Sequence, residues 1–116
     1  MPKRLVEKPW GREFLIVDEP EYAAKILEMR EGKPTSLHFH PLKKETLYVV
    51  SGRLRVETSE RDYELSPGDE VTIEPGTEHR IVPLEDSQVL EVSTQPKDDT
   101  VRVSDPYRRA KVEKVA

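Results

Sequence analysis

The chain contains no cysteine and no asparagine, and it has no long hydrophobic run. The lack of cysteine excludes a disulfide framework and any thiolate metal site. The lack of a long apolar stretch predicts that there is no transmembrane helix and no membrane partner. Because no apolar signal segment follows residues 1–4, we expect a cytoplasmic location. The formal net charge of −4 gives no electrostatic reason to expect a nucleic acid as a partner.

Short alternating segments separated by turns dominate the middle of the 116-residue chain. These segments lie at 26–29, 47–50, 53–58, 63–65, 70–74, 80–82 and 89–93. The pattern is typical of an all-β fold, either an antiparallel sandwich or a barrel. The two segments on either side of Ser51-Gly52 are predicted to form a β-hairpin.

The length suits a single domain, residues 1–116, with one core. We expect a motif-bearing barrel at about residues 22–95, with an N-terminal arm at 1–14 and a C-terminal extension at 96–116. Neither end shows clear periodicity, so the ends are expected to pack over the barrel or across a dimer contact, or to fray. The weak amphipathicity of Val112 and Val115 leaves one short C-terminal helix as an alternative.

All three histidines fall into one pattern with a glutamate. His38 and His40 are separated by one residue, Glu45 comes after four further residues, and His79 follows a proline–glycine turn at 75–76. On an extended strand the side chains at i and i+2 point to the same face, roughly 7 Å apart, so His38 and His40 can share one ion. Three imidazoles and one carboxylate form a near-complete ligand set for a divalent transition metal, and Mn, Zn, Ni and Fe all suit it.

Strand parity predicts that these four side chains face the interior. Glu45 has the parity of Leu47, and His79 has the parity of Ile81, and both apolar residues are expected in the core. A polar cluster inside a small barrel costs free energy unless it is paired or bound to a metal. Each histidine alone is more simply explained by ordinary hydrogen bonds. The four residues together predict a site for one divalent metal ion per chain.

Two blocks of the sequence resemble the two motifs of the cupin superfamily. The first block runs from Gly32 through His38-Phe39-His40 and Glu45 to Gly52, and the second from Gly68-Asp69 through Pro75-Gly76 to His79. The resemblance covers about residues 25–92 and implies a cupin-type antiparallel β-barrel, a jelly-roll-like double-stranded β-helix, with a metal at its centre. It also implies that His38, His40, Glu45 and His79 are the metal ligands. Pro83 stands where the second motif usually ends in Asn.

Both ends of the chain extend the resemblance to the cupin domain of type II mannose-6-phosphate isomerases. The similar segments are 6–12, 90–93, 98–102 and 105–107. They imply a metal-dependent aldose–ketose isomerase, or a related carbohydrate-active protein, with a sugar or sugar phosphate as its small-molecule partner. Three differences leave the substrate open: His38 replaces a common Gln, Thr46-Leu47 replaces His-Trp, and the 116 residues are not expected to include the guanylyltransferase domain that is fused to many of those isomerases.

Two other classes of function stay open at this point. Small cupins with three histidines and one glutamate include dioxygenases that activate oxygen on iron. A third interpretation is a non-catalytic, metal-dependent binder of a sugar or small anion. Whether the chain is an enzyme is therefore open, and no sequence feature identifies a general base.

Lysines near the predicted site have two interpretations each. Lys25 has the parity of Leu27 and Met29, which predicts that it faces the barrel interior and can hold a substrate phosphate. The alternative is a lysine at a strand end whose amine reaches solvent. Lys43 and Lys44 lie in the turn beside the ligands and are expected to be solvated.

Aromatic and apolar residues predict how the domain packs. Trp10 is expected to anchor the N-terminal arm, with stacking on a sugar as the alternative. Tyr48, Val50 and Val56 are expected to point outward and to form an apolar patch on one sheet. A second subunit is the simplest cover for such a patch, so we expect a homodimer.

Overall fold

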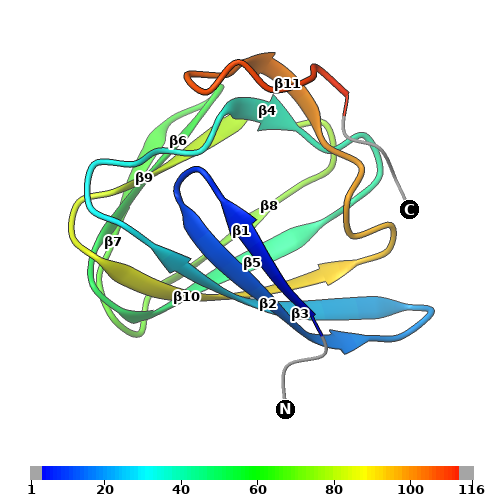
Figure 1. Ribbon diagram of the computed structural model, residues 1–116, viewed down its shortest axis with the longest axis horizontal. Helices are drawn as coiled ribbons and strands as arrows, with labels where there is room; N and C mark the ends of the chain where they lie inside the picture. The colour runs from blue at the N-terminus through cyan, green and yellow to red at the C-terminus, as the bar shows by residue number, and fades with distance from the viewer. Residues whose placement is uncertain (1–3, 113–116) are drawn as a thin grey trace.

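The computed structural model describes residues 4–112, which fold into two antiparallel β-sheets and contain no helix (Figure 1). The six-stranded sheet has the order β1-β2-β3-β10-β5-β8, and the five-stranded sheet has the order β11-β4-β9-β6-β7. The strands are β1 (Arg4–Lys8), β2 (Gly11–Asp18), β3 (Tyr22–Met29), β4 (Leu37–Phe39), β5 (Glu45–Ser51), β6 (Leu54–Thr58), β7 (Asp62–Leu65), β8 (Glu70–Ile73), β9 (His79–Pro83), β10 (Ser87–Thr94) and β11 (Val101–Ser104). The all-β prediction is confirmed, although within residues 4–112 the sheets do not close into one hydrogen-bonded barrel.

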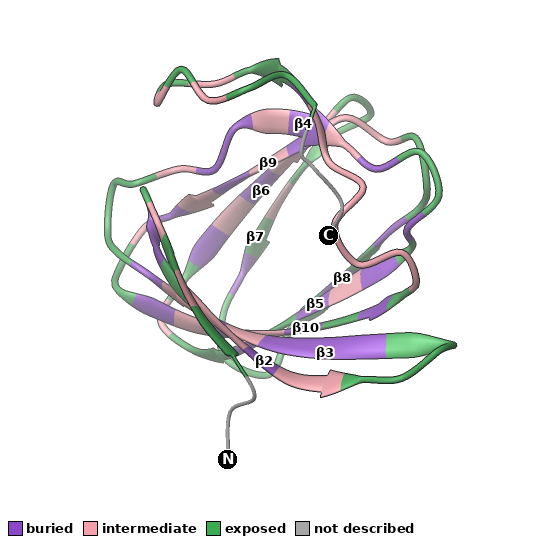
Figure 2. Ribbon diagram, turned by 45° about the vertical axis from the view of Figure 1, so that its right-hand side comes forward, coloured by how far each residue is buried: buried purple, intermediate pink, exposed green. Residues whose placement is uncertain are grey.

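The core lies between the two sheets and is built from alternate residues of the strands (Figure 2). In β5, Leu47 and Val49 are fully buried, whereas Tyr48 and Val50 are exposed. The fully buried aliphatic side chains are Met29, Leu47, Val49, Leu54, Val56 and Val89. Burial of each large aliphatic side chain stabilises the fold by roughly 1.5–3 kcal/mol. A shift of a strand by one residue would expose these side chains, so the alternation determines which face of each strand points inward.

The predicted hairpin between β5 and β6 is wrong. β5 pairs with β10 and β8, and β6 pairs with β7 and β9, so the chain crosses from one sheet to the other at residues 51–53. Gly52 has a φ of 87°, and a Cβ at this position would lie 2.5 Å from the Asp86 carbonyl oxygen. A glycine turn suits a crossing as well as a hairpin. The crossing places the apolar inner faces of both strands in one core.

The N-terminal arm is more regular than its sequence predicts. β1 pairs with β2 in antiparallel register from Arg4↔Leu15 to Lys8↔Gly11, and β2 pairs with β3. The arm therefore extends the six-stranded sheet instead of lying over it. Trp10 sits in the connection between β1 and β2, is 6% exposed and belongs to the hydrophobic core. This position agrees with the predicted packing anchor, and stacking on a sugar stays a prediction.

The C-terminal extension packs along the five-stranded sheet. β11 pairs with β4 at the edge of that sheet (Figure 1), and the register places Arg102 opposite His38. Beyond β11, the Tyr107 hydroxyl donates a hydrogen bond to the Pro34 carbonyl at 2.8 Å. These contacts make the extension, at least to residue 112, an ordered part of the fold.

The alternative of a short C-terminal helix is not supported in the described part of the chain. Val112 forms an isolated β-bridge with Val101, and residues 105–112 contain no helix. Val115 lies outside the described residues. Among residues 4–112, no helix is long and apolar enough to span a membrane.

The outer face of the six-stranded sheet carries a row of apolar side chains. Strand register aligns them across five strands in the order Leu5, Phe14, Ile26, Leu90 and Tyr48. Tyr48 and Val50 are 42% and 45% exposed, as their parity predicts. The prediction for Val56 is wrong, because β6 lies in the other sheet and Val56 is fully buried in the core. We define the outer apolar row as these five aligned residues.

Candidate metal centre

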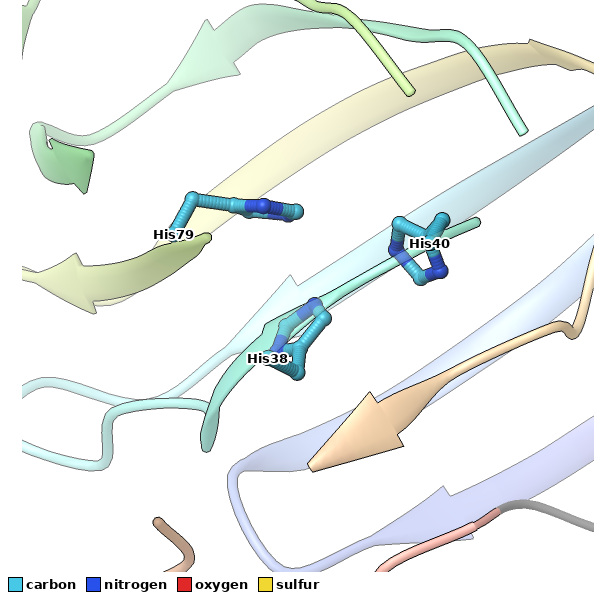
Figure 3. Close-up of side chains that lie close together, drawn as sticks. All are labelled: His38, His40 and His79. Carbon is cyan, nitrogen blue, oxygen red and sulfur yellow. The ribbon is translucent and has the colours of Figure 1, made fainter. Parts of the chain in front are cut away.

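The three histidine side chains converge in space (Figure 3). His38 lies on β4, His40 directly follows β4, and His79 begins β9, where it pairs with His38. One ring nitrogen of each histidine lies within 4.8 Å of the other two, and all three side chains are buried. The i, i+2 spacing on β4 and the pairing of β4 with β9 therefore gather the imidazoles around one point.

Hydrogen bonds orient two of these rings. His38 Nδ1 lies 2.8 Å from the Ser36 carbonyl oxygen, and His79 Nδ1 lies 2.9 Å from the Thr77 carbonyl oxygen. A carbonyl oxygen only accepts hydrogen bonds, so we assign the proton to Nδ1 and a lone pair to Nε2 in each ring. Burial and the two neighbouring imidazoles lower the pKa of His38 to about 3, which keeps it neutral at pH 7. Neutral imidazoles with this tautomer are metal ligands.

Glu45 joins the cluster from the first residue of β5. Its Oε2 lies 2.9 Å from His40 Nε2 and 3.4 Å from His79 Nε2. Burial opposes its ionisation, but the Lys43 ammonium and the two histidines outweigh burial and hold the pKa of Glu45 well below its usual range. Burial acts to lower the pKa of His79, and Glu45 outweighs it and raises that pKa. A buried carboxylate surrounded by imidazoles is an arrangement that a divalent cation stabilises.

The donor atoms fit a divalent metal ion. His79 Nε2 and Glu45 Oε2 are buried, face each other at 3.4 Å, and have no hydrogen-bond partner outside the cluster among residues 4–112. Leaving a buried polar atom without a partner costs about 1–3 kcal/mol, and a shared cation removes that cost for both atoms. The structure brings together all four predicted ligands, His38, His40, Glu45 and His79. The cluster is compatible with Mn, Zn, Ni or Fe, since imidazole and carboxylate suit each of them.

The expectation that Lys43 is solvated is wrong. Its side chain is 4% exposed, and its Nζ donates to Glu91 Oε2 at 2.8 Å and to the Lys97 carbonyl oxygen at 3.1 Å. Burial acts to lower the pKa of Lys43, but the carboxylates of Glu91 and Glu45 outweigh it and raise that pKa. Lys44, the next residue, is solvated as predicted, with a side chain that is 52% exposed.

Lys25 faces the interior, as its parity predicts. Its side chain is 6% exposed, and its Nζ lies 2.9 Å from Asp98 Oδ1 and 3.6 Å from Glu13 Oε2. The alternative of an amine that reaches solvent is therefore wrong. Burial acts to lower the pKa of Lys25, and the carboxylates of Glu91, Glu13 and Asp98 raise it overall. Lys25 is thus a buried cation beside the histidines, and its role in substrate binding stays a prediction.

A cavity of about 80 Å³ opens beside the cluster. Six cationic side chains line it, Lys8, Lys25, Lys43, Lys97, Arg102 and Arg109, beside four carboxylates, Glu13, Glu45, Glu91 and Asp98. Because the cations outnumber the carboxylates, the wall favours an anionic group on a ligand. Sequence reasoning did not identify Glu91 and Arg102 among the lining residues. The alternation of Val89, Glu91 and Ser93 on β10 predicts that Glu91 faces inward, but no local signal predicts that β11 pairs with β4.

The Cupin domain family matches residues 25–93 of this chain. The match includes the three histidines and Glu45, and it ends before the segment that forms β11. β1, β2 and β11 therefore lie outside the matched region.

Curated proteins and solved structures similar to the chain differ in their printed functions. An oxidoreductase of Arthrobotrys oligospora is 40% identical over 80 residues, which cover 66% of this chain and 31% of that protein. A mannose-1-phosphate guanylyltransferase of Escherichia coli is 26% identical over 111 residues, which cover 91% of this chain and 24% of that protein. The chain thus spans less than a third of either relative. The structure of KdgF from Halomonas sp. superposes with a TM-score of 0.76 at 28% identity, covering 83% of this chain and 89% of that one.

Proposed function

The chain belongs to the cupin family, and from this membership we propose that it binds one divalent transition-metal ion through its three histidines and Glu45. The proposal is carried by the convergence of buried donor atoms, of which His79 Nε2 and Glu45 Oε2 have no hydrogen-bond partner outside the cluster within residues 4–112. Coordination satisfies such atoms, whereas burial without a partner is unfavourable. When bound, the ion supplies Lewis acidity toward a substrate oxygen.

Elemental analysis of the purified protein tests this ligand assignment. We expect one equivalent of metal per wild-type chain, and loss of stoichiometric metal from the His40→Ala variant because one of four donors is removed. The Lys44→Ala variant is the control, since Lys44 lies in the same turn but is solvated. Undiminished metal in His40→Ala would reject the assignment.

For the chemistry, we propose aldose–ketose isomerisation of a sugar phosphate. Similarity to a mannose-1-phosphate guanylyltransferase over 91% of this chain and the cationic cavity wall support this substrate class. The reaction moves a proton between neighbouring carbon atoms, which requires a side chain that accepts and returns it. We assign this role to Glu91, because its carboxylate is buried, lines the cavity and is oriented by Lys43 Nζ at 2.8 Å.

The cationic wall is the proposed site for the substrate phosphate. Arg102 suits this role because it lines the cavity opposite His38, and guanidinium groups bind phosphate oxygens in a bidentate manner. Lys25, the candidate from sequence, is engaged by Asp98 and Glu13 and would have to leave these ion pairs to bind phosphate. Arg102 is engaged as well, since its Nη1 donates to the Ala110 carbonyl at 2.7 Å, so we assign the phosphate contact to the part of the wall that Arg102 and Lys25 share.

Activity measurements test the isomerase proposal. Mannose 6-phosphate and fructose 6-phosphate should interconvert in the presence of a divalent metal. Glu91→Gln should lower kcat by about 10²–10⁴-fold, as expected for loss of a general base. Arg102→Lys should act mainly on KM, because Lys lacks the bidentate geometry. Absence of turnover across a panel of aldose phosphates and free sugars would reject this activity.

A second candidate function is oxidation on iron. It is favoured by one observation, the 40% identity to a protein named as an oxidoreductase. Iron that co-purifies with the protein, together with oxygen uptake in the presence of a substrate, would support this candidate. A third outcome, thermal stabilisation by a sugar without turnover, would identify a non-catalytic metal-dependent binder.

We also propose that the chain forms a homodimer through the outer apolar row. The row crosses five strands, and a second copy brings an identical self-complementary face. Tyr48→Glu, which places a charge at the β5 end of the proposed interface, should give a monomer in analytical ultracentrifugation. Val103→Glu is the control, because Val103 is similarly exposed, at 49%, but lies on β11. A dimer that survives Tyr48→Glu would contradict this interface.

A further inference from the structure

Asp99 lies at the metal cluster although it falls outside the segment matched by the cupin family. It belongs to the stretch between β10 and β11, and its side chain is 12% exposed. Its Oδ2 accepts hydrogen bonds from the amides of Leu42 at 2.7 Å and Lys43 at 3.2 Å. Both amides lie in the turn between His40 and Glu45, so this carboxylate holds the turn that connects two of the proposed metal ligands.

The other oxygen of Asp99 faces His40. Oδ1 lies 3.4 Å from His40 Nδ1, and both atoms are buried without another hydrogen-bond partner among residues 4–112. This distance is slightly longer than the usual N···O separation of about 2.7–3.2 Å in an N–H···O hydrogen bond. A small rotation of the His40 ring would complete the bond. On the opposite edge of the same ring, Nε2 faces Glu45 Oε2 at 2.9 Å.

His40 differs from the other two histidines in how its ring is held. His38 and His79 each use Nδ1 to bond the carbonyl oxygen two residues earlier, at Ser36 and Thr77 respectively. Within residues 4–112 no carbonyl oxygen takes this role for His40, whose Nδ1 instead faces a carboxylate from a distant part of the chain. The ring of His40 is therefore the one whose orientation depends on the C-terminal extension.

We propose that Asp99 is a positioning residue of the metal centre, which accepts the Nδ1 proton of His40 and directs the Nε2 lone pair toward the ion. A carboxylate in this place fixes the tautomer and raises the basicity of the ligating nitrogen. The inference depends on the proposed metal binding. It makes the extension beyond residue 95 part of the metal centre, because the oxygen that orients one ligand comes from that segment.

The variant Asp99→Asn isolates this role. The asparagine carbonyl still accepts from the amides of Leu42 and Lys43, while its NH2 group, a donor, replaces the acceptor that faced His40 Nδ1. Loss of such a partner weakens metal binding by about 10–100-fold. We expect that increase in the Kd for Zn²⁺, measured by competition with a chromophoric chelator, together with an altered visible spectrum of the Co²⁺-loaded protein.

Asp18→Asn is the matched control. Asp18 holds the same segment through Gln95 Nε2 at 2.8 Å and Lys97 Nζ at 3.2 Å, whereas the carboxylates that face His40 are those of Asp99 and Glu45. We expect wild-type affinity for Zn²⁺ in this variant. An equal loss of affinity in Asp18→Asn and Asp99→Asn would overturn the proposal, because general loosening of the segment would then explain both.

A spectroscopic readout complements the affinity measurement. In the Zn²⁺-loaded wild-type protein, nitrogen-15 NMR of the histidine rings should show the His40 proton on Nδ1, because Nε2, which faces Glu45 Oε2 at 2.9 Å, is the proposed ligand atom. In Asp99→Asn the Nδ1 resonance should shift, since its acceptor is lost. A loaded wild-type His40 that binds the ion through Nδ1 would overturn the proposal, as would unchanged Zn²⁺ affinity in Asp99→Asn. Failure of the wild-type protein to bind any metal would instead reject the proposed function.

Discussion

The interior of this protein has an apolar part and an ionisable part that are equally buried. Three strands each carry both kinds of residue on one inner face, two positions apart: Glu45 and Leu47 on β5, His79 and Ile81 on β9, and Val89 and Glu91 on β10. Strand alternation decides that a side chain points inward, but it does not decide the chemistry of that side chain. Aliphatic burial stabilises the first part, whereas the second part depends on ion pairs and on the proposed metal to offset desolvation.

The largest effect is expected from breaking the buried pair Lys43–Glu91. Lys43→Met leaves the Glu91 carboxylate buried without its cation, which should lower the free energy of unfolding by about 3–5 kcal/mol. Urea denaturation of the metal-free protein measures this change. Lys44→Met, one residue away and solvated, should change stability by less than about 0.5 kcal/mol.

A double variant separates the pair from simple loss of packing. Lys43→Met with Glu91→Leu removes both charges, and it should recover most of the stability that Lys43→Met loses. If the double variant is as unstable as Lys43→Met alone, the packing of these side chains, and not their charge pairing, stabilises the ionisable part.

The apolar part should be more independent of the metal. Leu54→Ala leaves a cavity in the core, which should lower the free energy of unfolding by about 2–5 kcal/mol while the Kd for Zn²⁺ stays unchanged. Chemical denaturation and metal titration of the same variant check both statements. Leu42→Ala is the control, because Leu42 is 67% exposed. A marked loss of metal affinity in Leu54→Ala would show that the two parts are coupled.

The stability that the protein gains from metal binding should depend on the ionisable part and not on the apolar part. Zn²⁺ at 100 times its Kd should stabilise the wild-type protein by about 2.7 kcal/mol, and a chelator should reverse this gain. The same increment is expected in Leu54→Ala, because its site is intact, and it should vanish in His79→Ala. Thermal denaturation with and without metal gives the comparison. Persistence of the full increment in His79→Ala would contradict the ligand set.

The smallest effect is expected from an ion pair outside the core. Burial opposes ionisation of Asp105, but hydrogen bonds from the Arg109 guanidinium and from the Arg109 and Tyr107 amides lower its pKa to about 2. A pKa depressed from 3.8 stabilises the fold above pH 4, and the contribution is lost as pH falls through 2. After allowance for solvent screening, Asp105→Asn should cost about 1 kcal/mol at pH 7 and almost nothing at pH 2. Urea denaturation at both pH values measures it, and a pH-independent difference would contradict this account.

Periodic parts of the sequence predicted the fold well. The alternation around Leu47 and Ile81 places Glu45 and His79 inside, and the i, i+2 spacing places His38 and His40 on one face, as found. The pairing partners of β5 were not predictable from Ser51-Gly52, since a glycine turn serves a hairpin or a crossing between sheets. Val56 was misplaced for the same reason.

The rest of the site depends on contacts that leave no local signal. Lys43 sits in a turn without periodicity, and its burial follows from the Asp99 carboxylate that bonds its amide 56 residues away in the chain. Arg102 reaches the cavity because β11 pairs with β4, and Glu91 was left unassigned because one inward glutamate has no motif of its own. Long-range pairing of this kind is decided by the packing of the whole domain.

The pairing of β11 with β4 also limits how this domain can be cut and recombined. A fragment trimmed to the family-matched residues 25–93 would lose β11 on one sheet and β2 on the other. β4, with His38, and β3 would then become open edges with unpaired backbone groups, which invite edge-to-edge aggregation. Chimeras and minimal versions of this metal site should therefore keep residues 4–112 as the unit of exchange.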